Sequence, residues 1–189
     1  MTNETGETSG PENDKAGRPV RRPRFNCGRL DMRIARDGTW FYHGTPIGRK
    51  EMVRLFASVL ERRADGSFWL ATPAEEGIVE VEDAPFLAVE LFVAGSGPDQ
   101  RLFFRTNVED IVPLDAAHPL RLGADGAVHD DTRGAIPYLW VRKGLEARLS
   151  RAVYYELVAM GIEERRDGAL VYGVWSERIF FPLGCLTPE

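Results

Sequence analysis

The stretch MRIARDGTW at Met32–Trp40 decides the fold, because the chain repeats its pattern as LRLGADGAV at Leu120–Val128. Both copies carry an arginine in the second position and an Asp-Gly pair, which is Asp37-Gly38 in the first copy and Asp125-Gly126 in the second. An Asp-Gly pair after alternating polar and apolar residues is typical of a tight β-hairpin, since glycine adopts the positive φ that the turn requires. Each copy therefore predicts a β-hairpin.

The repeat continues beyond the hairpins. In the first copy, apolar residues at helical spacing predict a helix that begins near Arg49, and its stripe consists of Met52, Leu55, Phe56, Val59 and Leu60. In the second copy, we expect a helix from about Leu145 to Met160. Similar acidic-basic turns follow, ERRADG at Glu61–Gly66 and ERRDG at Glu164–Gly168. The sequence thus predicts a duplicated unit of β-hairpin, helix and strand, with a period far longer than that of a solenoid repeat.

Further strands are expected outside the hairpins. Phe86–Ala94 is the most apolar run and predicts a buried strand, with Arg101–Thr106 as its hairpin partner. Shorter strands are expected at Ser67–Ala71, Gly77–Glu82, Ala169–Val174 and Arg178–Leu183.

The predicted fold class is α+β, with two repeated halves and mainly antiparallel sheets, because each helix has one apolar stripe that must pack against a sheet. We place a tail at residues 1–24, the N-terminal half at 25–112 and the C-terminal half at 113–189. The second copy carries extra residues around His129–Arg133, where two equal units could have acquired different roles.

Composition narrows the class of protein. The 189 residues carry a formal net charge of -5, which gives no general attraction to the phosphate backbone of nucleic acids, although arginines gather in the tail. No apolar run approaches the length of a membrane-spanning helix, and residues 1–24 lack the apolar core of a secretory signal. We therefore expect a cytoplasmic protein. The two cysteines, Cys27 and Cys185, have no metal-site spacing, and a redox pair between them stays open.

Basic and aromatic residues gather before the first predicted helix. Glycines and a proline form a compact loop there, so the backbone N–H groups of the first helical turn could bind an anion. Arg49 and Lys50 would add positive charge, and Trp40 or His43 could stack on a planar ring. The alternative is that Trp40 belongs to the core and that the two basic residues are ordinary solvated charges.

A second set of residues could form the facing wall of a cleft between the halves. Arg105 and Asn107 lie just before the predicted boundary, and Trp140, Arg142 and Trp175 supply similar chemistry in the second copy. The default alternatives are a strand end at the surface for the first two and core positions for the aromatic residues.

Two segments carry a family resemblance. DMRIARDGTWFYHGTPIGRK at Asp31–Lys50 and SERIFFPLG at Ser176–Gly184 resemble the bacterial domain-of-unknown-function family numbered 1285. The resemblance covers residues 25 to 186 and implies a duplicated core whose C-terminal half is superficially similar to pleckstrin-homology folds. It also implies a nucleotide-like ligand at the interface between the halves and a role in signal transduction.

Catalytic and metal motifs are weak in this chain. It has no GxSxG elbow, P-loop or GxGxxG motif, and His129-Asp130-Asp131 is a poor metal site because adjacent strand residues point to opposite faces. We therefore expect a non-enzymatic ligand-binding or regulatory protein without metal or cofactor, which binds an anionic nucleotide-like or other phosphorylated small molecule between its halves. The alternatives are a hydrolase-type enzyme that uses His43 with Asp31, and an adaptor that binds a protein partner.

Overall fold

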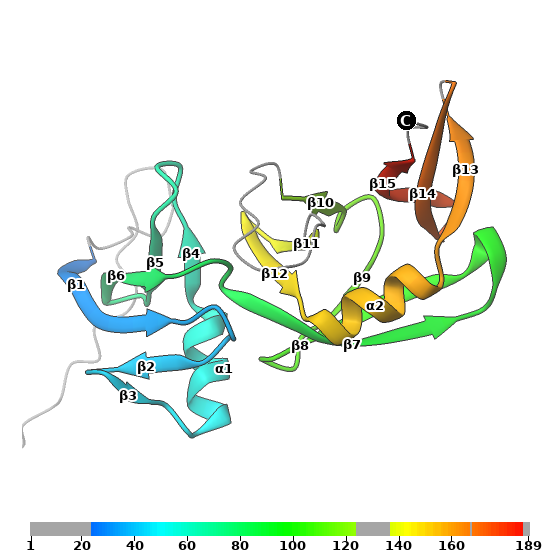
Figure 1. Ribbon diagram of the computed structural model, residues 1–189. Helices are drawn as coiled ribbons and strands as arrows, with labels where there is room; N and C mark the ends of the chain where they lie inside the picture. Colours follow the sequence, from blue (N-terminus) through cyan, green and yellow to red (C-terminus); the bar gives the residue numbers. More distant parts are fainter. Residues whose placement is uncertain (1–23, 124–136, 167, 187–189) are drawn as a thin grey trace, which may run out of the picture.

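A computed structural model describes residues 24–123, 137–166 and 168–186, which form three β-sheets and two α-helices (Figure 1). Only two neighbouring strand pairs, β1 with β6 and β7 with β12, are parallel within these described ranges. The predicted α+β class with repeated halves and mainly antiparallel pairing is confirmed.

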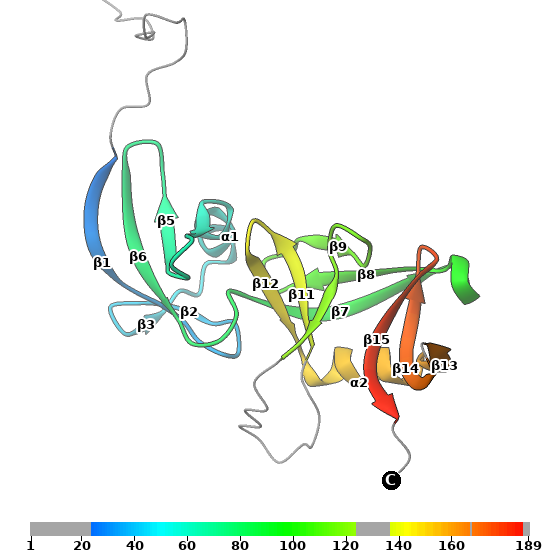
Figure 2. The same cartoon turned by 90° about the horizontal axis from the view of Figure 1, so that it is seen from above.

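The first sheet and helix α1 form the N-terminal half of the molecule. The strand order is β3-β2-β1-β6-β5-β4. Its strands are β1 (Phe25–Ile34), β2 (Trp40–Tyr42), β3 (Thr45–Pro46), β4 (Leu60–Arg62), β5 (Phe68–Ala71) and β6 (Glu75–Val81). Helix α1 (Lys50–Ser58) connects β3 to β4 and lies on the side of this sheet that faces the second sheet (Figure 2).

The second sheet has the order β10-β11-β12-β7-β8-β9. Its strands are β7 (Phe86–Ala94), β8 (Arg101–Thr106), β9 (Ile111–Pro113), β10 (Leu120–Leu122), β11 (Pro137–Arg142) and β12 (Leu145–Leu149), and a 3-10 turn, η1 (Gly97–Asp99), connects β7 to β8. Helix α2 (Arg151–Ala159) packs on β7 and leads into a separate three-stranded sheet of β13 (Ile162–Arg166), β14 (Ala169–Ser176) and β15 (Ile179–Leu186).

The duplication predicted from the sequence is present in the strand pairing. Strand β1 pairs with β2 through Arg33 opposite Phe41, and β10 pairs with β11 through Arg121 opposite Tyr138. Each arginine lies over its aromatic partner, at 4.2 Å from the Phe41 ring centroid and 4.6 Å from that of Tyr138. The repeated arginine is therefore a structural cation–π contact that both copies keep.

The two copies also share their second turn. His43-Gly44 connects β2 to β3 and Lys143-Gly144 connects β11 to β12, and all four residues have positive φ. The copies differ in how their strands are used afterwards. In the first, β6 returns to pair with β1, whereas in the second, β12 pairs with β7 and β13–β15 form a sheet of their own.

The hydrophobic core is continuous between the halves. Buried side chains of the first sheet, such as Ile34 and Trp40, belong to the same cluster as Phe86 and Phe104 of the second. Because this cluster includes both sheets, the halves share one core rather than two separate ones.

The predicted start of the second helix, at about Leu145, is wrong. Residues 145–149 form strand β12, and the helix starts only after Ser150, whose Oγ accepts a hydrogen bond from the N–H of Val153. In β12, Leu145, Ala147 and Leu149 are buried and the two residues between them are not, which is the period of a strand. The short alternating run was misassigned because it directly precedes a true helical segment.

Three further expectations need correction. The stripe of α1 is only partly buried, since Leu55 is 64% exposed and Met52 is 38% exposed, while Ala57 is buried. Strand β7 is buried at its start, but Phe92 and Val93 near its end are exposed. The predicted acidic-basic turns begin within strands β4 and β13, which pair with the strands that follow them.

The two halves divide at a different place from the one we predicted. Strands β7–β9 share a sheet with β10–β12, so the division between the sheets falls between β6 and β7, whereas the predicted boundary follows residue 112. The Asp125-Gly126 turn and the insertion around His129–Arg133 lie outside the described residues. Within the described part of the chain, no helix is both long and apolar enough to span a membrane.

Candidate ligand-binding groove between the halves

A groove with a volume of about 690 Å³ lies where α1 of the N-terminal half meets the second sheet. Residues of both halves line it: Glu51, Arg54, Leu55, Ala57 and Ser58 from α1, and Val108, Asp110 and Arg142 from the second sheet and its loops. This is the junction at which the sequence predicted a ligand.

Helix α1 supplies one wall of the groove. The exposed side chains of Glu51, Arg54 and Leu55 lie on successive turns of its outer face, and the buried Ala57 contributes to the lining near the end of the helix. The Ser58 hydroxyl donates to the backbone oxygen of Leu55 at 2.7 Å, so its oxygen keeps the capacity to accept a further hydrogen bond.

The turn between β8 and β9 supplies the opposite wall. The Oγ1 atom of the fully buried Thr106 accepts hydrogen bonds from the N–H groups of Val108 at 3.3 Å and Asp110 at 3.1 Å. Glu109 has a φ of 67°, which is unfavourable for a residue with a Cβ, and the bonds of its neighbours hold it there. The turn thus presents Val108 and Asp110 to the groove from a fixed backbone.

Arg142 connects the two walls. Its Nη1 donates to Asp110 Oδ2 at 2.7 Å, and its Nη2 donates to the backbone oxygen of Ala57 at 2.9 Å. The Ala57 carbonyl lies at the C-terminal end of α1, where the helix dipole favours a cation. The guanidinium also lies 5.1 Å from the ring centroid of the buried Phe86. One side chain therefore joins α1, the β8–β9 turn and the start of β7.

Asn107 forms a second connection between the halves. Its Nδ2 donates to the backbone oxygen of Gly38 at 2.9 Å, and its Oδ1 accepts from the N–H of Leu87 at 3.0 Å. Gly38 is the glycine of the first hairpin turn, with a φ of 83°, and a Cβ there would lie 2.6 Å from the Asn107 amide nitrogen. Asn107 was expected to line the cleft, and it instead joins the two halves.

A cluster around Asp83 makes a third connection. The Tyr138 hydroxyl donates to Asp83 Oδ1 at 2.8 Å, and Arg148 Nε lies 3.5 Å from Asp83 Oδ2. Burial, together with the hydrogen bond to the Asp83 carboxylate and its charge, raises the pKa of Tyr138 to about 12. These contacts join Asp83, which precedes β7, to strands β11 and β12.

Of the residues predicted at the first helix, none lines the groove. Trp40 is 1% exposed and stacks on Phe56 with ring centroids 6.3 Å apart, so it belongs to the core and its expected stacking on a ligand is corrected. Arg49 and Lys50 are exposed at the start of α1, one turn before the lining residue Arg54.

His43 lies in the turn between β2 and β3. Its Nδ1 is 2.7 Å from Asp31 Oδ2, and its ring lies 4.1 Å from that of Tyr42. The structure therefore brings together the two residues of the predicted acid-base pair. Both are well exposed, at 63% for His43 and 68% for Asp31, and neither lines the groove.

The remaining predicted residues are dispersed. Arg105 is held by Glu90 and Glu109 on the outer face of β8, and both partners raise its pKa. Trp140 is partly exposed on β11 without lining the groove, and Trp175 lies in the three-stranded sheet against Phe180. Of the nine candidates, only Arg142 lines the groove.

Sequence reasoning missed most of the lining. The helical spacing predicts that Leu55 belongs to the buried stripe of the first helix, and Arg54 lies outside that stripe. Val108 and Asp110 lie near the end of the predicted N-terminal half, where the sequence carries no motif. No sequence signal identifies these positions, because they become neighbours only when the second sheet packs beside α1.

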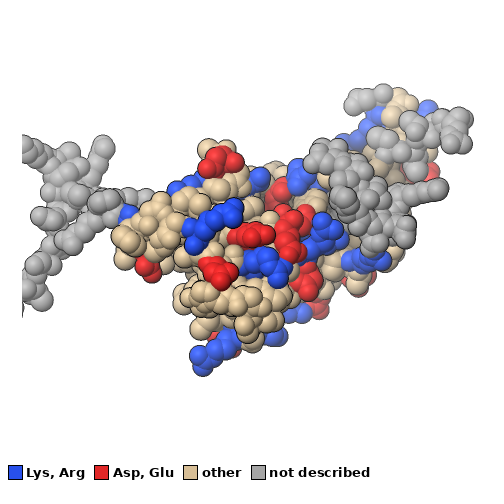
Figure 3. All heavy atoms as spheres, turned by 60° about the vertical axis from the view of Figure 1, so that its left-hand side comes forward, with Lys and Arg blue, Asp and Glu red and all other residues tan. Residues whose placement is uncertain are grey.

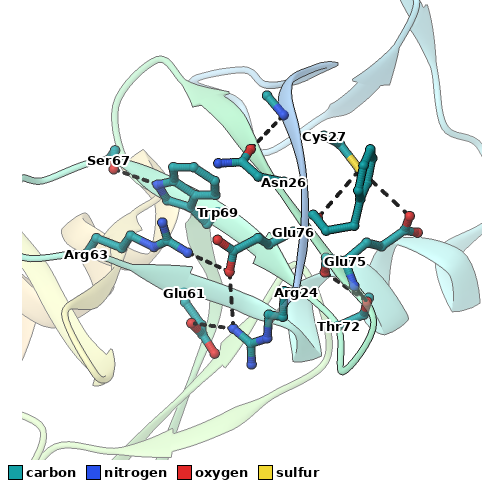
Figure 4. A network of polar contacts seen from close by, with 12 residues as sticks. Arg24, Asn26, Cys27, Glu61, Arg63, Ser67, Trp69, Thr72, Glu75 and Glu76 are labelled. Atoms are coloured by element: carbon teal, nitrogen blue, oxygen red, sulfur yellow. Dashed lines mark hydrogen bonds and ion pairs between the residues drawn. The ribbon is translucent and has the colours of Figure 1, made fainter. Parts of the chain in front are cut away.

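The outer surface of the N-terminal half carries charges of both signs. In Figure 3, acidic and basic side chains are interspersed on this face. In the first sheet, Arg24 and Arg63 both contact Glu76, and the Arg63 guanidinium lies over Trp69 at 3.6 Å from the ring centroid (Figure 4). The two arginines lower the pKa of Glu76, chiefly through the Arg63 hydrogen bond. This network stabilises the sheet surface and buries Trp69.

Cys27 in strand β1 is an exposed free cysteine. The exposed Cys27 thiol lies 3.7 Å from a Glu75 carboxylate oxygen, and its pKa is raised by desolvation and by that carboxylate (Figure 4). Within the described ranges, no group of three or more His, Cys, Asp or Glu side chains could hold a metal ion. The His129-Asp130-Asp131 cluster lies outside those ranges.

The fold and groove define a two-part α+β protein with an internal duplication, in which helix α1 and the second sheet line one joint groove. Residues 19–84 match the N-terminal domain, and residues 85–183 the C-terminal domain, of the family described as a protein of unknown function, DUF1285. The chain belongs to the DUF1285 family.

Two solved structures are similar to this chain. One is a DUF1285 family protein from Silicibacter pomeroyi DSS-3, with 42% identity and a TM-score of 0.76 over 95% of this chain and 91% of that chain. The other is a DUF1285 family protein from Shewanella baltica OS155, with 29% identity and a TM-score of 0.53 over 69% of this chain and 91% of that chain. No curated protein matches the chain.

Proposed function

We propose that this chain is a cytoplasmic, non-enzymatic ligand-binding or regulatory protein with a role in signal transduction, and that its ligand binds in the groove between the halves. The observation that carries the proposal is that both halves contribute to one groove of about 690 Å³. That volume is within the usual range of small-molecule sites. Arg54 and Arg142 supply two guanidinium groups, which favour an anionic group such as a phosphate or carboxylate.

The two guanidinium groups have different roles in this proposal. Arg142 already donates to Asp110 and to the Ala57 carbonyl, so its bonds hold the walls together. The Arg54 side chain is exposed and makes no hydrogen bond or ion pair with any described residue. Arg54 is therefore the side chain that an anionic group of the ligand would contact first.

A thermal-shift screen with nucleotides and other phosphorylated metabolites tests the proposal. A ligand at about a hundred times its dissociation constant should stabilise the protein by about 2.7 kcal/mol. Arg54→Ala should abolish the shift, whereas Arg29→Ala, which removes an exposed arginine of β1 outside the groove, should keep it. If neither this panel nor carboxylate-bearing compounds such as amino acids raise the unfolding temperature of the wild type, the proposal fails.

The same screen separates the groove from the site predicted at the start of α1. If the ligand is bound by the first helical turn, Arg49→Ala and Lys50→Ala will abolish the shift and Arg54→Ala will not. That outcome would contradict the assignment to the groove while leaving ligand binding itself in place.

A hydrolase-type activity is the second candidate, because Asp31 and His43 form a close pair. An aspartate that orients a histidine is one part of many general-base systems. Turnover of a phosphoester that is lost in His43→Ala and in Asp31→Asn, with the fold retained, would support this candidate. The adaptor alternative has less local support, namely exposed apolar residues such as Phe92 and Ile111 on the second sheet.

A further inference from the structure

The groove carries two opposite charges that pair with no described residue. Arg142 and Asp110 neutralise each other at 2.7 Å. The other charged lining residues, Glu51 and Arg54, make no ion pair or hydrogen bond with any residue that the structure describes. They are three positions apart on α1, so their side chains lie on the same side of the helix.

This charge pattern discriminates between classes of ligand. A purely anionic ligand would gain attraction from Arg54 and meet repulsion from Glu51 at nearly the same place. A ligand with both an anionic and a cationic group would satisfy both side chains. The Ser58 oxygen beside them can accept a hydrogen bond from an ammonium group.

The uncharged lining of the groove favours an aliphatic ligand group over a planar ring. Leu55, Ala57 and Val108 are aliphatic, and no aromatic side chain lines the groove among the described residues. A planar base would therefore find no ring on which to stack, since Trp40 lies in the core. An aliphatic side chain would instead remove the exposed surface of Leu55 from water.

We infer that the ligand of this groove is an aliphatic zwitterion, either a free amino acid or a short peptide, with its carboxylate at Arg54, its ammonium group at Glu51 and its side chain on Leu55. This inference rests on the proposed function and specifies the ligand of the same groove. It does not require catalysis.

Isothermal titration of the full chain with four matched probes tests the inference. Leucine and leucyl-leucine carry both charges, 4-methylpentanoate lacks the ammonium group, and 3-methylbutylamine lacks the carboxylate. The better zwitterion should bind at least about tenfold more tightly than either singly charged probe, which corresponds to about 1.4 kcal/mol. The comparison of leucine with leucyl-leucine shows whether the ligand is an amino acid or a peptide.

Variants connect the preference to the two side chains. Arg54→Ala should weaken zwitterion binding about tenfold, and Glu51→Gln should weaken it similarly. Neither change should weaken the probe of like charge, so Arg54→Ala should leave the amine bound at least as tightly and Glu51→Gln should leave the acid bound at least as tightly, because each removes a repulsion. Arg29→Ala and Glu80→Gln, which change exposed residues outside the groove, should have no effect.

Different outcomes would overturn the inference and the proposed function. If a nucleotide or 4-methylpentanoate binds in an Arg54-dependent way and the zwitterions bind no more tightly, the inference is overturned and the proposed function stands. If neither these probes nor the phosphorylated panel bind, both are overturned.

Discussion

At the residue scale, several conspicuous side chains of the sequence serve the fold. Ser176, in the second segment that carries the family resemblance, is fully buried, accepts from the N–H of Leu102 at 3.1 Å and donates to the Leu114 carbonyl at 2.6 Å. Glu177 and Arg178 have positive φ at a turn where glycine is usual. Their backbone N–H groups donate to the carbonyls of Gln100 and Pro98, which holds the turn against the β7–β8 connection.

Tyr138 provides a test at the residue scale. Because its pKa is raised to about 12 in the folded protein, against about 10 for an ordinary tyrosine, the folded state favours the neutral phenol. Its contribution to stability should be complete below about pH 10 and should be lost as the pH rises from about 10 to about 12. The phenolate absorbance of the wild type minus that of Tyr138→Phe should therefore have a midpoint near pH 12.

Asp83→Asn should lower this midpoint, because it removes the carboxylate that opposes ionisation. Circular dichroism at each pH must show that the protein remains folded. A midpoint near pH 10 in the folded wild type would contradict the described environment of Tyr138.

At the element scale, short turns decide where strands begin. Lys143-Gly144 turns the chain into β12, and His43-Gly44 turns it into β3. Both turns require positive φ, for which glycine has no steric cost. The register of each strand pair follows from its turn, so a substitution at the glycine strains an entire hairpin.

Gly144→Ala should lower the free energy of unfolding by about 1 to 2 kcal/mol, because alanine at a φ of 80° places its Cβ too close to the backbone. Urea unfolding of the variant gives this difference. Gly48→Ala is the matched control, since Gly48 has no positive φ and a Cβ there would meet no atom within 4 Å. Equal effects of the two variants would refute the role of the turn.

At the scale of the whole molecule, several contacts join the two halves. The core cluster includes both sheets, and Asn107, Arg142 and the Tyr138–Asp83 pair connect them at the surface. A division into independently unfolding halves would expose this shared core to water. We therefore expect the halves to unfold together.

Calorimetry of the wild type should show a single transition with equal calorimetric and van't Hoff enthalpies. Asn107→Ala should lower the free energy of unfolding by about 1 to 3 kcal/mol, because it leaves the N–H of Leu87 and the carbonyl of Gly38 without their partner. Asn26→Ala is the control, since the Asn26 side chain bonds only to the exposed N–H of Gly28 among the described residues. Two resolved transitions in the wild type would contradict the shared core.

The sequence by itself determined the hairpin turn at Asp37-Gly38, the start of α1 and the strands β7 and β8, because these depend on φ preferences and on the spacing of neighbouring residues. The sequence also showed the duplication, since the pattern of Met32–Trp40 recurs at Leu120–Val128. Only the tertiary structure decided which side chains meet in the groove. Arg54 and Arg142 are far apart in the chain and line one groove because α1 packs beside the second sheet, and Trp40 is in the core because it packs on Phe56 of α1. Local preferences do not encode such distant contacts, which arise when two sheets bury one continuous apolar surface.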